Sequence, residues 1–472
     1  MTAVTPWEEP DFPALPAGFR FGAATAAYQI EGAHDLDGRA PSIWDTFSHT
    51  PGHTLGGATG DTACDHYHRY REDVGLLRGL GVDSYRFSIA WPRLLPQGTG
   101  PVNQKGLDFY DRLIDELFAS GIRPAVTLYH WDLPQALEDR GGWRVRETAE
   151  AFASYAALAA ERYGDRVERW ITLNEPYCSA FVGYAEGRHA PGVQEGRGAL
   201  AAAHHLLVAH GLAVRELRAA GAREIGIALN LDRIHAASER PEDLAAVRRA
   251  EVLHNDVWTE PLLAGRYPAQ EAETWAGLAD GPWRQPGDLE VIGAPLDFLG
   301  VNFYRPITVA AAPHRTDDLE ARTAVDIGVT ELDPYGTRHT TMGWPVVPAA
   351  LTELLCELHA RYSQLPPVWI TENGAAFEDV ARPEGRVHDP ERTRYLAAHL
   401  AAVADAAAAR VDVRGYYVWS LLDNFEWARG YNQRFGLVHV DYDTLTRTPK
   451  DSYHWYRGLI TAHRARTEES SR

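Results

Sequence analysis

Two glutamates that end apolar segments are the residues whose type and setting could do chemistry. Glu372 ends VWITE (residues 368–372), and Glu175 ends ITLNE (residues 171–175), 197 positions earlier. Short, continuously apolar runs predict strands that are buried on both faces, and an acid at the end of such a strand lies where the strand leaves the core. Two carboxylates that face one bond can hydrolyse a glycosidic linkage, one as acid and base, the other as nucleophile or as base for water.

Alternating strand and helix patterns surround these segments. Strands are expected at 19–25, 84–91, 123–131, 169–174, 224–231, 297–304, 368–372 and 415–422. Between them, apolar residues recur at three- and four-residue steps, which is typical of amphipathic helices. One such stripe comprises Tyr67, Tyr70, Val74 and Leu77 and is ended by Gly79 and Gly81; another comprises Tyr110, Leu113, Ile114, Leu117 and Phe118 and is ended by Gly121.

Eight strand–helix units without a linker predict a single (β/α)8 TIM barrel of class α/β. We assign residues 1–18 to an N-terminal extension, 19–460 to the barrel and 461–472 to a polar C-terminal tail. Loops at the carboxyl ends of the strands form the active site of such barrels. The polar residues of this chain gather there: Gln29, Arg86, His130, Asn174, Glu175, Asn302, Tyr304, Glu372, Trp419 and Glu426. The long connection 305–367 is expected to line part of the mouth.

Composition and charge exclude several classes of function. The net charge of −19, from 46 basic and 65 acidic residues, argues against a nucleic-acid partner. No apolar run is long enough to cross a bilayer, so no membrane association is expected. The N-terminus lacks a signal-like segment, and the cysteines Cys64, Cys178 and Cys356 cannot all pair, so we expect reduced thiols in a cytoplasm. We attribute the scarcity of lysine, which occurs only at Lys105 and Lys450, to coding bias.

Histidine pairs offer little support for a metal site. His66 with His68, or His204 with His205, lacks a third ligand at a strand end, and no HExxH motif occurs. The sequence also lacks the GxSxG, Walker A and GxGxxG motifs of common serine hydrolases and nucleotide-binding proteins. We therefore expect neither a metal nor a cofactor.

Four segments, in order and spacing, resemble the signatures of glycoside hydrolase family 1. FRFGAATAAYQIEG (19–32) resembles the N-terminal signature, TLNEP (172–176) the acid/base motif, ITENG (370–374) the nucleophile motif and WSLLDNFEW (419–427) the sugar-binding segment. The resemblance runs from Phe19 to about Trp455.

This resemblance implies a retaining β-glycosidase with Glu175 as acid/base and Glu372 as nucleophile. It also implies that Trp419 is the stacking platform of the non-reducing sugar and that Trp344 lies on the aglycone side. The residues that it implies for the sugar hydroxyls are Gln29, His130, Asn174, Glu426 and Trp427. We add Trp131, Tyr304 and Phe435 to the expected substrate contacts.

Retaining cleavage requires that one glutamate is protonated and the other ionised. Arg86 would favour an ionised Glu372 by Coulomb attraction and Tyr304 by a hydrogen bond, and Asn302 is a further expected support. In retaining enzymes the carboxyls lie about 5 to 5.5 Å apart. At an effective dielectric constant of about 20, one carboxylate then disfavours ionisation of the other by roughly 3 kcal/mol. An ionised Glu372 thereby keeps Glu175 protonated.

The expected function is that of a β-glucosidase that hydrolyses small β-glycosides. Phospho-sugar members of the family carry a serine and a basic residue where this chain has Glu426, and myrosinases carry a glutamine in place of Glu175, so uncharged O-glycosides are favoured. A β-galactosidase or β-fucosidase, a transglycosidase and an inactive sugar-binding barrel remain alternatives. A homo-oligomer is also left open.

Overall fold

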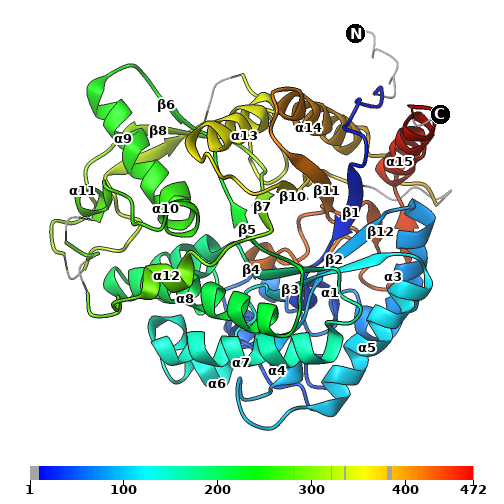
Figure 1. Cartoon of the computed structure of the whole chain (residues 1–472), viewed down its shortest axis with the longest axis horizontal. Coiled ribbons are helices and arrows are strands. Elements are labelled where there is room, and N and C mark those ends of the chain that lie inside the picture. Colours follow the sequence, from blue (N-terminus) through cyan, green and yellow to red (C-terminus); the bar gives the residue numbers. More distant parts are fainter. Residues whose placement is uncertain are drawn as a thin grey trace.

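A closed parallel barrel forms the centre of the molecule (Figure 1). The computed structural model describes residues 10–275, 277–279, 281–319, 321–333, 336–379 and 385–470. Within these residues eight strands pair in the order β1-β11-β10-β7-β5-β4-β3-β2, which confirms the predicted barrel. The strands are β1 Arg20–Ala24, β2 Ser84–Ser88, β3 Arg123–Tyr129, β4 Arg169–Asn174, β5 Glu224–Asn230, β7 Phe298–Asn302, β10 Val368–Asn373 and β11 Val413–Trp419.

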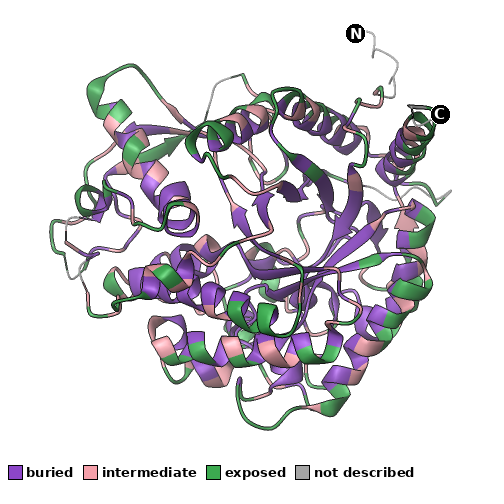
Figure 2. Cartoon of the chain, viewed as in Figure 1, coloured by how far each residue is buried: buried purple, intermediate pink, exposed green. Residues whose placement is uncertain are grey.

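Helices surround the barrel and bury its outer face (Figures 1 and 2). The longer ones are α3 His66–Leu80, α5 Gln104–Ala119, α7 Arg146–Tyr163, α8 Arg197–Ala219, α9 Pro241–Glu251, α10 Val257–Ala264, α13 Ala349–Arg361, α14 Pro390–Ala408 and α15 Asp451–Ser470. Shorter ones are α1 Ala27–Ile30, α2 Ile43–His49, α4 Trp91–Leu94, α6 Gln135–Glu138, α11 Glu271–Trp275 and α12 Asp288–Ile292. Two π-helical segments, η3 Cys178–Ala185 and η4 Val252–Asp256, and three 3-10 turns, η1 Leu55–Gly57, η2 Gly142–Arg144 and η5 Trp427–Arg429, complete the described helices.

The long connection 305–367 contains regular structure that the sequence patterns did not indicate. Its strands β8 Ile307–Ala311 and β9 Val329–Leu332 join β6 Ile234–Ala236 in a small sheet, and α13 follows. A second small sheet pairs β12 Val438–Val440 with β13 Arg447–Pro449. Pro334 and Tyr335 of this connection lie outside the described residues.

The apolar stripes behave as predicted in α3 and with one exception in α5. α3 buries its four stripe residues and ends at Gly81, whose left-handed backbone (φ 80°) is accessible to glycine at little cost. Gly79 remains inside the helix. In α5, however, Phe118 is 66 % exposed, so its place in the buried stripe was wrong. Because successive residues of a helix are rotated by about 100°, Phe118 lies beyond Ile114 around the helix axis, at the edge of the apolar face.

Both ends of the described chain pack on the same side of the barrel (Figure 1). Trp455 of α15 donates a hydrogen bond to the carbonyl oxygen of Pro10 at 3.0 Å, and its ring contacts Phe12. Residues 461–470, which we assigned to a polar tail, continue α15, and His463 there is buried against Phe21. No described helix combines the length and the apolar character that a bilayer crossing requires.

Candidate active site

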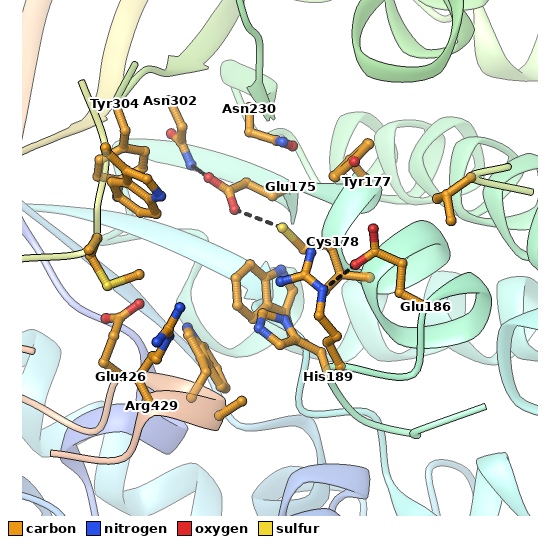
Figure 3. A pocket seen from close by; sticks show the side chains of 18 of the residues that line it. Glu175, Tyr177, Cys178, Glu186, His189, Asn230, Asn302, Tyr304, Glu426 and Arg429 are labelled. Carbon is orange, nitrogen blue, oxygen red and sulfur yellow. Dashed lines mark hydrogen bonds and ion pairs between the residues drawn. The ribbon is translucent and has the colours of Figure 1, made fainter. Parts of the chain in front are cut away.

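A cavity of about 940 Å3 opens at the carboxyl ends of the barrel strands, and both Glu175 and Glu372 line it. Figure 3 shows Glu175 and Glu426 in its wall. Its volume suits a ligand larger than one sugar ring. The other predicted site residues in its wall are His130, Trp131, Asn302, Tyr304, Trp344, Trp419, Glu426, Trp427 and Phe435. Gln29, Arg86 and Asn174 are buried next to these residues and do not line the cavity. Met342 and Trp344 confirm that the connection 305–367 contributes to the mouth.

Glu372, near the end of β10, is held by two donors. Arg86 of β2 donates through Nη1 to Oε1 at 2.6 Å, and the hydroxyl of Tyr304 donates to Oε2 at 2.6 Å. Tyr304 is itself held because the hydroxyl of Tyr395, from α14, donates to its carbonyl oxygen at 3.0 Å. Burial raises the pKa of Glu372, whereas Arg86 and Tyr304 counteract this by stabilising the carboxylate.

Glu175, directly after β4, has a different environment. Asn302 donates to its Oε1 at 2.8 Å, and the Cys178 thiol donates to Oε2 at 3.3 Å (Figure 3). Among the described residues no basic side chain lies within ion-pair distance of this carboxylate. Burial, followed by the negative charge of Glu372, raises the pKa of Glu175 to about 8. Glu175 is therefore mainly protonated at neutral pH, while Glu372 has a cation to hold its charge.

Hydrogen bonds connect the partners of Glu372 with the partners of Glu175. Arg86, which binds Glu372, also donates through Nη2 to Oδ1 of Asn174 at 2.6 Å. Asn302, which binds Glu175, donates to the same oxygen at 3.0 Å. The two carboxyls thus lie in one cavity and share a connected hydrogen-bond network, which places an acid and a carboxylate against the same ligand.

Three buried polar atoms near the glutamates have no partner among the described residues. They are Oε1 of Gln29, Nδ1 of His130 and Oε2 of Glu426. The amide of Gln29 is fixed by donating to Oδ1 of Asn424 at 3.0 Å and to the carbonyl oxygen of Phe425 at 2.8 Å. Burial lowers the pKa of His130 well below its usual range, so its ring is neutral. Unpaired buried polar atoms are rare, so these atoms are suited to bind hydroxyl groups of a ligand.

Aromatic rings form two groups in the cavity wall. Trp419 and Trp427 both stack with His130, at centroid distances of 5.7 and 5.9 Å, and Trp427 contacts Trp131 at 4.4 Å. The second group joins Trp344 to Tyr304 at 5.2 Å and to Phe435 at 6.0 Å. Flat apolar faces with polar edges suit the C–H surfaces of sugar rings.

Backbone geometry at this cavity departs from ordinary values. Trp131, Glu175 and Trp427 have φ values of 76°, 44° and 51°, a region that residues other than glycine rarely adopt. Such strain often occurs at functional sites. Gly374 allows close packing behind Glu372, since a Cβ atom there would lie 1.7 Å from the carbonyl oxygen of Trp419.

Sequence reasoning missed two residues that support the glutamates. Cys178 follows Glu175 by three positions, a spacing that places side chains on one side of a helix, but no sequence pattern indicated the π-helical segment η3. Tyr395 belongs to α14 and could not be assigned to Tyr304 from spacing. The histidines weighed as metal ligands have other contacts: His66 contacts Asp73 and His204 contacts Asp288. Within the described ranges no cluster of three or more potential ligands could hold a metal.

Comparisons with known proteins agree with this geometry. The family described as Glycosyl hydrolase family 1 matches residues 12–465. Thermostable beta-glucosidase B of Thermobispora bispora is 50 % identical over 457 residues, covering 96 % of this chain and 92 % of the relative. A bifunctional beta-D-glucosidase/beta-D-fucosidase of Bifidobacterium breve is 48 % identical over 464 residues, covering 96 % and 99 %.

Solved structures show the same likeness in three dimensions. The family 1 β-glucosidase of Thermotoga maritima, in complex with isofagomine lactam, superposes with a TM-score of 0.90 at 46 % identity and covers 96 % of this chain and 100 % of that one. The family match, the relatives' identity and the barrel geometry together show that the chain belongs to glycoside hydrolase family 1.

Proposed function

We propose that the chain is a retaining β-glucosidase that removes terminal non-reducing β-D-glucosyl residues from oligosaccharides and from aryl or alkyl glycosides. The observation that carries this proposal is the difference between two glutamates in one cavity. Glu372 contacts Arg86 and Tyr304, whereas Glu175 has no basic partner in the described part of the chain and has a pKa raised to about 8 by burial and by the charge of Glu372. One carboxylate and one carboxylic acid are what retaining glycoside cleavage requires.

In the first step, Glu175 gives its proton to the glycosidic oxygen as the leaving alcohol departs. The carboxylate of Glu372 attacks the anomeric carbon from the opposite face and forms a covalent glycosyl ester. Arg86 and Tyr304 hold the attacking carboxylate in place.

In the second step, the charge balance reverses. Esterification removes the negative charge of Glu372, so the pKa of Glu175 falls and Glu175 becomes a base. It accepts a proton from water, which attacks the anomeric carbon and releases the sugar with its original configuration. A sugar acceptor in place of water would give transglycosylation by the same step.

We assign the three unpaired buried atoms to hydroxyls of the bound glucose. Gln29 and Glu426 supply acceptors, His130 supplies a donor, and Trp419 supplies an apolar face. We also assign Asn174, one residue before Glu175 and buried beside the cavity, to the 2-hydroxyl, a contact that strengthens in the transition state. We assign Trp344, in the aromatic group of Tyr304 and Phe435, to the aglycone.

The natural substrate and compartment are further parts of the proposal. As natural substrates we propose short β-glucans such as those from cellulose breakdown; the cavity volume supports this only in that it leaves room for more than one sugar ring. β-D-Fucosidase activity is a second candidate, since a relative with 48 % identity carries both activities in its name. Three free cysteines support a cytoplasmic location.

The configuration of the first product tests the proposal. A methyl or aryl β-glucoside is turned over, and proton NMR records the anomer of glucose before mutarotation. The β-anomer is expected. Initial α-glucose would rule out the covalent intermediate, and absence of turnover would favour an inactive sugar-binding barrel. Matched aryl β-glucosides, β-galactosides and β-fucosides then rank the sugars.

A further inference from the structure

A network of charged side chains, all buried except the partly buried Arg434, adjoins the sugar-binding wall, and the proposed chemistry does not use it. Its six members, which we call the charge network, are Asp379, Asp389, Arg392, Asp423, Arg434 and Lys450. Three acidic and three basic groups balance one another. The side chains of Lys450, Asp379 and Asp423 are 0 % exposed.

Lys450 connects two segments of the active site. Its Nζ donates to Oδ1 of Asp423 at 2.7 Å and also to Oδ2 of Asp379. Asp379 follows β10, the strand that carries Glu372 as its second-last residue, and Asp423 follows β11, three residues before Glu426. One ammonium group therefore joins the segment after the nucleophile strand to the segment that carries the sugar contacts.

Asp423 closes the segment that carries these contacts. Its Oδ1 accepts from the backbone N–H of Gly436 at 2.9 Å, and its Oδ2 accepts from Nη1 of Arg434 at 2.8 Å. Glu426, Trp427 and Phe435 lie between the two ends of this closed segment. The approach is close: a Cβ on Gly436 would lie 2.1 Å from the backbone nitrogen of Asp423.

Arg392 of α14 completes the connection. Its Nε donates to the carbonyl oxygen of Ala375 at 3.2 Å, and its Nη2 donates to that of Arg434 at 2.6 Å and to Oδ2 of Asp379 at 2.7 Å. The guanidinium thus binds both segments that Lys450 joins.

The residue type at position 450 is informative. Of 46 basic residues only Lys105 and Lys450 are lysine, so arginine is the usual cation of this chain. Coding bias explains why lysine is rare, but it does not explain a fully buried one. A compact ammonium with three donors fits between two carboxylates, whereas a planar guanidinium needs a larger space.

We propose that Lys450 is a positioning residue for the glucose-binding wall and sets the affinity for the sugar through Asp423 and Asp379. This inference rests on the proposed function. The catalytic glutamates are held by separate contacts, from Arg86 and Tyr304 to Glu372 and from Asn302 to Glu175. Loss of Lys450 therefore weakens sugar binding more than it slows the chemical step.

The test compares Lys450→Met with Lys105→Met. Lys105 is exposed and binds Asp37 at 2.8 Å, so its replacement is a matched control. A burst assay counts the active sites, so that kcat is expressed per functional enzyme. Lys450→Met should raise the inhibition constant of glucose and the KM of an aryl glucoside at least about tenfold. Its kcat should stay within about threefold of the native value. The Lys105 variant should match the native enzyme. Unchanged glucose affinity, or a loss confined to kcat, would overturn the inference.

Two further measurements separate positioning from loss of stability. The double variant Lys450→Met/Asp379→Asn restores the charge balance of the network. Its folding stability should therefore recover, while its affinity for glucose stays weak. Full recovery of the glucose affinity would contradict a positioning role. In the native protein, the two lysine side chains give two resolvable NMR signals. Glucose should shift the Lys450 signal and leave that of Lys105 unchanged; no shift on binding would refute the coupling. Glucose binding is read without turnover, so these results stay distinct from failure of the proposed hydrolysis.

Discussion

Replacement of Glu372 by glutamine should lower the pKa of Glu175. Burial and the negative charge of Glu372 raise that pKa to about 8, and the substitution removes the second cause while keeping the shape of the side chain. It also leaves the Arg86 cation, 2.6 Å from Oε1 in the native protein, without its counter-charge, which further favours ionisation of Glu175.

The size of the effect follows from Coulomb's law. At a carboxyl separation of about 5 Å and an effective dielectric constant of about 20, the repulsion is roughly 3 kcal/mol. One pKa unit corresponds to about 1.4 kcal/mol, so the pKa of Glu175 should fall by about 2 in Glu372→Gln. Burial and the hydrogen bonds from Asn302 and Cys178 persist in both proteins.

Difference infrared spectroscopy can measure this pKa directly. Spectra of Glu372→Gln minus those of the Glu175→Gln/Glu372→Gln double variant isolate the carboxyl band of Glu175 across a pH titration. Native minus Glu175→Gln spectra give the reference. Glu186→Gln is a matched control, because Glu186 lines the same cavity but pairs with Arg188. An unchanged pKa in Glu372→Gln would refute the argument that the charge of Glu372 keeps Glu175 protonated.

Three further predictions concern the same groups. Glu175→Ala should reduce kcat/KM at least about 100-fold more on alkyl glucosides than on activated aryl glucosides, because only poor leaving groups need the proton; equal losses would contradict the acid role. Burial and Glu372 raise the pKa of Glu175 from 4.5 to about 8, so between these pH values Glu175 ionises in the unfolded chain but stays protonated in the native protein, and the native protein loses stability as the pH rises. Denaturant unfolding should show Glu175→Gln more stable than native by about 3 kcal/mol at pH 7 and equal near pH 4; a pH-independent difference would oppose this. Tyr304→Phe removes a 2.6 Å hydrogen bond to Glu372 and should lower kcat by about 10- to 100-fold in steady-state assays, whereas a change below twofold would argue against that support.

The barrel and most of its site could be predicted because their signals are local. Each strand is a short apolar run, and polar residues such as Glu175 and Asn302 stand at strand ends, which meet at one rim of a closed parallel sheet. The partners of Glu372 were also predictable, since Arg86 and Tyr304 lie on or after barrel strands.

Other features depended on contacts that the sequence pattern does not encode. The left-handed backbone of Glu175 and Trp131 is imposed by the surrounding fold, since neither residue type favours it. The strands β8 and β9 are short and partly exposed, so they lack a clear apolar alternation. Lys450 was attributed to composition because its two carboxylate partners are 27 and 71 residues away in the chain.

The most direct test of the central claim is azide rescue of Glu372→Ala. The substitution removes the proposed nucleophile and opens space beside Arg86 and Tyr304. The variant should lose turnover of an activated aryl β-glucoside, and added azide should restore part of it, with NMR identifying the product as α-glucosyl azide. Formation of the β-azide would contradict the assignment of Glu372, because a nucleophile that enters in its place must invert the anomeric carbon.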